Sequence, residues 1–211
     1  ADPMAEFLVP LVKGYCTERS IEVTSLGLQI HGGMGFIEET GVAQLCRDAR
    51  ILPIYEGTTS IQANDLLGRK VMRDGGDVAR RFSGLVVETE AELQKGGPKA
   101  QIIAKRLAEA RAAFDTSLDW LLKTVPTDIS SAFAGSVPFL MIAGNLAAGW
   151  QLGRSVLIAE AQLDQGKDVE FMSRKIATAY FYAQHILIDC TAECTRIIEG
   201  SESLFDPDFQ L

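Results

Sequence analysis

The sequence KAQIIAKRLAEARAAFDTSLDWLLK, residues 99–123, contains neither proline nor glycine and is typical of a long helix. Further helical segments are predicted on either side of it, over residues 77–95, 130–165 and 169–199. The connections combine a helix terminator with an N-cap for the next helix: Gly96-Gly97-Pro98, Val125-Pro126-Thr127-Asp128 and Gln165-Gly166-Lys167-Asp168. Because short connections favour antiparallel neighbours, the four segments predict an antiparallel helical bundle.

Three features of these segments bear on how they pack. Pro138 is expected to kink or split its helix, because proline lacks a backbone donor and clashes with the preceding turn. The small residues between Ala143 and Trp150 favour close packing against another helix, with a ligand pocket as the less favoured alternative. An apolar stripe on the last segment is predicted to face the core: Phe171, Ile176, Ala179, Tyr180, Ala183, Ile186 and Leu187.

The first part of the chain is helical as well, but in shorter pieces. An amphipathic helix is predicted over residues 6–28, followed by a glycine-rich break over 29–39 and a short helix ending near Arg50. Pro53 precedes another helix from about Thr58 to Met72, and Gly75-Gly76 closes the region. Strand-period alternation is absent, so we predict an all-α fold with a first unit at residues 1–74 and a second at 75–211.

Composition narrows the classes of function. The 211 residues carry a formal net charge of -8 and are 47% hydrophobic, which is typical of a globular chain and unfavourable for binding nucleic acid. The sequence shows no membrane-spanning run and no signal peptide, so we expect a cytoplasmic protein without membrane insertion. Cys190 and Cys194 share a helical face with His185, but buried apolar cysteines are favoured over a metal site, and none is predicted.

Glu56 is the first candidate for chemistry. It stands in Ile54-Tyr55-Glu56-Gly57-Thr58-Thr59-Ser60, where apolar neighbours are expected to raise the carboxyl pKa and the following helix N-terminus to lower it. Gly57 would let a substrate carbonyl approach closely. The local pattern also fits a simpler interpretation, an acidic residue at a helix N-terminus with Thr58 or Thr59 as its cap.

The second candidate is the glycine-rich segment Gln29-Ile30-His31-Gly32-Gly33-Met34-Gly35-Phe36. Such turns expose backbone donors to phosphate groups, although they also occur by chance. The segment is not a Rossmann fingerprint, because no strand precedes it.

The motifs together are more specific than either alone. The pattern Gln29-x-x-Gly32-Gly33-x-Gly35-Phe36, then Arg47-Asp48-Ala49-Arg50, then Ile54-Tyr55-Glu56-Gly57-Thr58 resembles the acyl-CoA dehydrogenase family in order and spacing. The resemblance covers roughly residues 7–70, the end of that family's C-terminal helical domain. The region after Gly76 resembles the additional C-terminal helical domain of a prokaryotic subgroup.

The resemblance implies a role for each motif. Glu56 would remove the α-proton of an acyl-CoA thioester while a β-hydride passes to FAD, leaving a trans-2-enoyl-CoA, with Tyr55 and Gly57 against the substrate. Gln29, Gly32 and Gly33 would contact FAD, commonly that of a neighbouring subunit. Thr58 would also touch FAD, whereas Ser60 replaces a glutamine common in eukaryotic members, which puts the Ser60 contact in doubt.

Other residues of these motifs receive no catalytic role. His31 lies where the family contacts flavin, and it is left unassigned despite an ordinary pKa of about 6.5. Arg47 and Asp48 are predicted to form a structural ion pair that braces the turn before Glu56.

The implied partners are an acyl-CoA substrate, an electron-transfer flavoprotein and further copies of the chain, as a dimer or tetramer, in fatty acid metabolism. Two alternatives stay open: an acyl-CoA oxidase that returns electrons to oxygen, and a non-catalytic helical assembly or interaction module. The family's N-terminal helical and middle β-domains are not among these 211 residues, so the isolated chain is expected to be inactive.

Overall fold

The computed structural model describes residues 2–208, which are helical almost throughout and contain no strand, so the predicted all-α fold is confirmed. Within this described part, no helix is long and apolar enough to cross a membrane. The elements are α1 (Pro3–Pro10), the π-helix η1 (Leu11–Tyr15), α2 (Cys16–Ile30), α3 (Gly33–Phe36), the 3-10 helix η2 (Glu38–Thr40), α4 (Val42–Ile51), α5 (Thr59–Asp65), the π-helix η3 (Leu66–Val71), the 3-10 helix η4 (Met72–Asp74), α6 (Asp77–Leu93), α7 (Pro98–Thr124), α8 (Ile129–Ala134), α9 (Ser136–Leu163), α10 (Val169–His185) and α11 (Asp189–Leu204).

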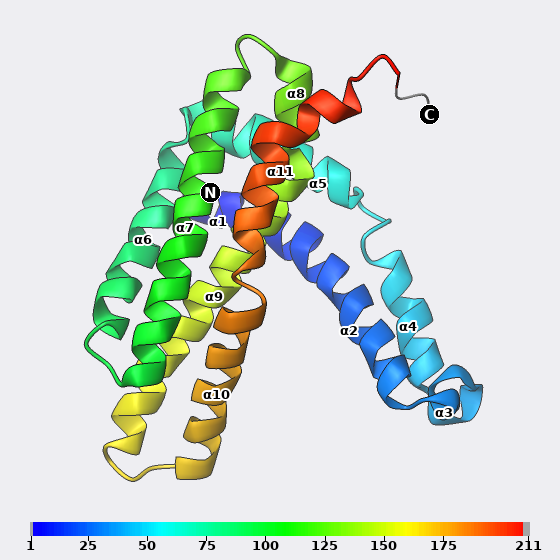
Figure 1. Ribbon diagram of the computed structural model, residues 1–211. Helices are drawn as coiled ribbons and strands as arrows, with labels where there is room; N and C mark the ends of the chain where they lie inside the picture. Colours follow the sequence, from blue (N-terminus) through cyan, green and yellow to red (C-terminus); the bar gives the residue numbers. More distant parts are fainter. Residues whose placement is uncertain (1, 209–211) are drawn as a thin grey trace.

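The long helices form the predicted bundle. Helices α6, α7, α9, α10 and α11 pack along one another, with hairpins between α6 and α7 and between α9 and α10 (Figure 1). Aromatic rings fill the centre: Phe114 stacks on Phe139 at 5.2 Å and meets Phe82 edge-on at 5.7 Å between ring centroids. All three rings are fully buried, so this cluster anchors the hydrophobic core.

The predicted split of the segment 130–165 is present, but it lies at Gly135 rather than at Pro138. Helix α8 ends at Ala134, and α9 begins at Ser136 after a break at Gly135. Pro138 lies in the first turn of α9, where backbone N–H groups have no intrahelical acceptor, so its missing donor costs no hydrogen bond.

The single helix predicted over residues 169–199 is wrong, because α10 ends at His185 and α11 begins at Asp189. The break contains neither proline nor glycine. It turns Leu187 into the core against Gly149, where an added Cβ would lie 2.7 Å from Leu187 Cδ2, so tertiary packing interrupts a locally helical sequence. The predicted core position of Phe171 is also wrong, since this side chain is 58% exposed near the start of α10.

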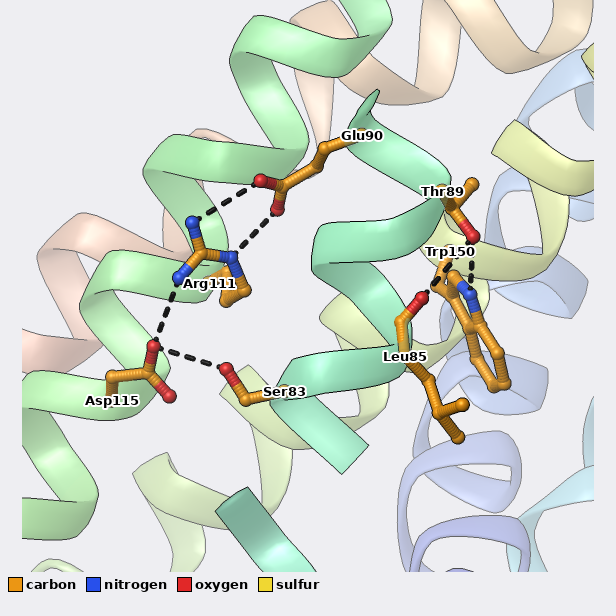
Figure 2. A network of polar contacts seen from close by, with 7 residues as sticks. All are labelled: Ser83, Leu85, Thr89, Glu90, Arg111, Asp115 and Trp150. Carbon is orange, nitrogen blue, oxygen red and sulfur yellow. Dashed lines mark hydrogen bonds and ion pairs between the residues drawn. The ribbon is translucent and has the colours of Figure 1, made fainter. Parts of the chain in front are cut away.

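A polar network joins three bundle helices (Figure 2). Arg111 of α7 donates to both carboxylate oxygens of Glu90 on α6, at 2.8 and 3.1 Å, and also to Asp115 at 3.1 Å. On the other side of α6, Trp150 Nε1 donates to Thr89 Oγ1 at 2.8 Å. Because Glu90 is almost fully buried, its paired geometry satisfies a carboxylate that would otherwise destabilise the bundle.

The helical run from α1 to α2 contacts the bundle mainly through its N-terminal part, α1 and η1. Figure 1 shows α1, η1 and α2 as one continuous run that leads away from the bundle, with α4 beside α2 and α3 at the outer end. The run is fixed where Tyr15 of η1 packs on Gly144 of α9: an added Cβ there would lie 2.2 Å from Tyr15 Cγ. The prediction that small residues near Gly144 allow close helix packing is confirmed.

A buried polar junction reinforces this attachment. The hydroxyls of Tyr15 and Tyr182 lie 2.9 Å apart, and the Tyr182 hydroxyl also donates to the backbone carbonyl of Asn145 at 3.2 Å. Burial raises the pKa of both tyrosines, so both stay neutral in the physiological range. Cys190 and Cys194 are buried nearby, as the apolar interpretation predicts.

Candidate functional site

The glycine-rich segment forms a tight turn at the outer end of α2. Gly32 has φ 58° and ψ -143°, a conformation that essentially only glycine adopts, and its amide donates to the Gln29 carbonyl at 3.1 Å. Gly35 is required for a different reason, since a Cβ would lie 2.4 Å from the Leu28 carbonyl oxygen. Gln29 and Gly33 are exposed on this turn, and a Cβ added to Gly33 would meet no atom within 4 Å.

Glu56 lies in the turn between α4 and α5 with an unusual backbone conformation. Its φ is +53°, followed by Gly57 at +94°. The left-handed region costs a side-chain-bearing residue about 1–2 kcal/mol, so surrounding contacts must hold Glu56 there. One of them is Gln62 Nε2, which donates to the Glu56 carbonyl at 3.4 Å.

Within this chain the Glu56 side chain is exposed, as is that of Tyr55. The apolar shielding expected from the neighbouring sequence is therefore not provided by the described residues themselves. The apolar residues Ile54 and Tyr55 do precede Glu56, but their side chains are exposed, as the Glu56 side chain is.

The start of α5 follows the predicted capping. Thr58 is the N-cap, and its hydroxyl accepts from the Ile61 amide at 3.4 Å, which confirms the threonine cap. Thr59 donates to the carboxylate of Glu18, which ties α5 to α2. Ser60 is exposed in the first turn of α5.

The two motifs lie apart in the molecule. The glycine turn is at the outer end of the α2–α4 pair and Glu56 is at the inner end (Figure 1). The ten residues of α4 separate them, which corresponds to about 15 Å of helix rise. One copy of the chain thus presents two separate clusters: Gln29, Gly32 and Gly33 in one, and Tyr55, Glu56, Gly57, Thr58 and Ser60 in the other.

The predicted pair between Arg47 and Asp48 is wrong. Arg47 instead makes a two-pronged contact with Glu38, 2.9 Å to each carboxylate oxygen, because consecutive residues of a helix point in different directions. This exposed pair closes the loop from α3 to α4. His31 contacts the Gly27 carbonyl through Nδ1 at 3.0 Å and so helps to terminate α2.

Two residues outside the predicted motifs, Lys13 and Glu18, also contact the Glu56 turn. Lys13 donates from Nζ to the Leu52 carbonyl at 2.6 Å, and Glu18 accepts from Thr59. The available signal was Lys13 itself, a lone cation in the apolar run Leu8-Val9-Pro10-Leu11-Val12-Lys13-Gly14-Tyr15. Among residues 2–208, no group of three or more His, Cys, Asp or Glu is placed to hold a metal ion.

Comparison with known families agrees with this arrangement of fold and motifs. Residues 1–71 match the family described as "Acyl-CoA dehydrogenase, C-terminal domain", and residues 83–208 match "Acetyl-CoA dehydrogenase C-terminal like". The chain therefore belongs to the acyl-CoA dehydrogenase family.

Individual relatives are similar over most of this chain. It is 68% identical over 204 residues to the 3-methylmercaptopropionyl-CoA dehydrogenase of Ruegeria pomeroyi, covering 97% of this chain and 35% of that protein. It is 34% identical over 193 residues to a broad-specificity linear acyl-CoA dehydrogenase of Mycobacterium tuberculosis, covering 86% and 31%. A subunit of the caffeyl-CoA reductase-Etf complex of Acetobacterium woodii is 42% identical over 52 residues, covering 25% and 14%. The chain thus spans about a third of the length of the first two relatives.

Proposed function

We propose that the protein containing this chain is an FAD-dependent acyl-CoA dehydrogenase in which Glu56 is the base that removes the substrate's α-proton. Membership of the family and the order of the motifs support this proposal. The observation that carries it is the backbone of Glu56, a glutamate at φ +53° directly before a glycine at +94°. Strained conformations of this kind cluster at functional sites, where geometry takes precedence over stability.

The chemistry assigns one proton transfer to this chain. The Glu56 carboxylate would accept the α-proton of the thioester, and FAD, when bound, would supply the acceptor for the β-hydride. The product is a trans-2-enoyl-CoA. A carboxylate suits the step because a positioned base with a lone pair accepts the proton directly, whereas an amide at position 56 would not.

Water exclusion must come from elsewhere, because Glu56 is exposed within this chain. We propose that parts of the protein outside these 211 residues complete the acyl-CoA cleft and cover Tyr55 and Gly57 together with the substrate. Removing water would strengthen the electrostatic interactions around the carboxylate and the thioester carbonyl. The isolated chain is then inactive, as expected from the sequence.

The glycine turn fits a contact with FAD. Gly32 takes a conformation that essentially only glycine adopts, and the exposed Gly33, where an added Cβ would meet no atom within 4 Å, leaves room for a close approach beside Gln29. Thr58 and Ser60 would meet FAD at the other cluster. Since α4 separates the two clusters, we propose that they serve FAD molecules of different subunits, which makes a dimer or tetramer part of the site.

The names of the relatives support a proposal for the substrate and the electron acceptor. The 68% identity to the Ruegeria protein makes 3-methylmercaptopropionyl-CoA the first thioester to test, and the linear acyl-CoA esters named for the mycobacterial relative come next. We propose an electron-transfer flavoprotein as the electron acceptor. The name of the Acetobacterium relative, a subunit of a caffeyl-CoA reductase-Etf complex, includes such a partner.

The test is an anaerobic titration of the full-length protein with these thioesters while flavin absorbance is followed. Bleaching by at least one thioester and reoxidation by an electron-transfer flavoprotein are the expected results. Rapid reoxidation by oxygen instead would identify an oxidase. A protein without flavin, or one that no thioester bleaches, would favour the non-catalytic assembly module.

A further inference from the structure

The turn that carries Glu56 is held by two side chains of the helical run from η1 to α2. We propose that Lys13, together with Glu18, is a positioning residue that fixes the geometry of the proposed base; the inference rests on the proposed function. Neither side chain belongs to the motifs that carry the family resemblance. Both act through the backbone or the flanking residues of the turn rather than by touching a substrate.

The first contact is at the end of α4. Lys13 Nζ donates to the carbonyl of Leu52, the C-cap residue of α4, at 2.6 Å. Carbonyls at a helix C-terminus carry partial negative charge and lack intrahelical donors, so an ammonium group satisfies both needs. The same ammonium lies 5.6 Å from the centroid of the Tyr55 ring, one residue before Glu56. Lys13 therefore contacts the turn at two points on the N-terminal side of Glu56.

The second contact is on the other side of the turn. Thr59, the first residue of α5, donates from its hydroxyl to Glu18 of α2. The connection that contains Glu56 is thus tied on both sides to a single helical run. A non-glycine residue in the left-handed region persists only where the surroundings determine it, and these ties provide that constraint.

The run that supplies the ties is itself rigid. Gly14, next to Lys13, packs so closely on α9 that an added Cβ would lie 2.6 Å from Leu140 Cδ2. Tyr15 packs on Gly144 and shares a hydrogen bond with Tyr182 of α10. Lys13 therefore lies where the N-terminal helices pack against the bundle. Its side chain connects this packed region to the Glu56 turn.

The test compares Lys13→Met with Lys13→Arg in the full-length protein. Methionine keeps most of the apolar stem and removes the donor, whereas arginine can donate to one carbonyl and lie over an aromatic ring. We expect Lys13→Met to slow flavin reduction by acyl-CoA by about tenfold or more while the apparent affinity for the thioester changes less than about twofold. Lys13→Arg should restore most of the rate, and Lys105→Met on α7 serves as a control.

Hydrogen exchange supplies a readout that is independent of turnover. The amides of Ile54 and Tyr55 both donate to the Ile51 carbonyl, at 3.0 and 3.1 Å. In Lys13→Met they should exchange about tenfold faster, with the bundle helices unchanged, because the loss is local. Thr59→Val removes the hydrogen bond to Glu18 and should also speed exchange in this turn. This variant replaces Lys13→Met as the test if Lys13→Met folds poorly.

The outcomes separate this inference from the proposed function. Normal flavin reduction together with unchanged exchange at Ile54 and Tyr55 in Lys13→Met would overturn the positioning role. If Glu56→Gln retained normal flavin reduction, the proposed base would be wrong, while the exchange data would still decide whether Lys13 holds the turn.

Discussion

Replacing Gly144 by alanine tests the junction on which the candidate site rests. The added Cβ would lie 2.2 Å from Tyr15 Cγ and 2.4 Å from Cδ2, well inside the usual separation of about 3.5–4.0 Å for carbon atoms. Since Gly144 lies in the interior of α9, the ring must move or η1 must shift away from the bundle. Either movement disturbs the 2.9 Å contact between the Tyr15 and Tyr182 hydroxyls.

The magnitude follows from these two effects and one that opposes them. Overpacking costs about 1–3 kcal/mol, and losing a neutral hydrogen bond adds about 0.5–1.5 kcal/mol. The higher helix propensity of alanine offsets about 0.5–1 kcal/mol of this loss. We therefore expect the free energy of unfolding to fall by about 1–3 kcal/mol. For a domain of this size that corresponds to a midpoint lower by about 2–12 °C.

Gly84→Ala in α6 is the matched control, because its added Cβ meets no atom within 4 Å. A glycine to alanine change in an open helix position should stabilise the protein by about 0.5–1 kcal/mol. Thermal and urea unfolding, followed by far-UV circular dichroism, measure both variants. Equal stability of the Gly144→Ala variant and the parent protein, or equal losses in the two variants, would refute the close-packing argument.

Further predictions concern three other residues of the chain. Glu90→Ala leaves Arg111 with one carboxylate partner fewer in a largely buried site. The free energy of unfolding, measured with urea, should fall by about 1–3 kcal/mol. An unchanged free energy of unfolding would mean that the pair is energetically neutral. Gly35→Ala places a Cβ 2.4 Å from the Leu28 carbonyl oxygen and should open the turn after α2. Hydrogen exchange in this turn should then rise, and the flavin content of the full-length protein should fall. Retained flavin would argue against the cofactor contact. Burial raises the pKa of Cys190 to about 12, so it should resist alkylation in the folded protein at mildly alkaline pH, whereas the exposed Cys16 should be modified. Because the unfolded thiol loses its proton at the ordinary pKa of 9.0, the contribution of Cys190 to stability should be present below that pH and decline as pH rises toward about 12; flat stability over this range would contradict its burial.

The fold was predictable where local signals act. Proline and glycine mark the turns around α7 and α9, and Thr58 marks the start of α5. The break between α10 and α11 was not predictable, because it arises from the packing of Leu187 on Gly149 rather than from a breaker residue. The division of the chain near Gly75-Gly76 into two units stays a prediction.

The candidate site was predictable in its residue types and less so in its geometry. The sequence indicated Glu56 and the glycine turn, but not that α4 separates them or that Glu56 adopts a left-handed backbone. Lys13 was missed because its contact is with a backbone carbonyl 39 residues away, which leaves no pattern in the side chains. The exposure of Glu56 likewise depends on what covers the turn, and local sequence does not specify that.

The most direct test of the central claim is rapid mixing of full-length Glu56→Gln with a thioester that bleaches the parent protein, under anaerobic conditions. The variant should keep its flavin and bind the thioester, because glutamine preserves the size of the side chain, yet flavin reduction should fall by several orders of magnitude with the base removed. Flavin reduction at the parent rate would show that another group takes the α-proton, and the account of the Glu56 turn as a catalytic site would be wrong.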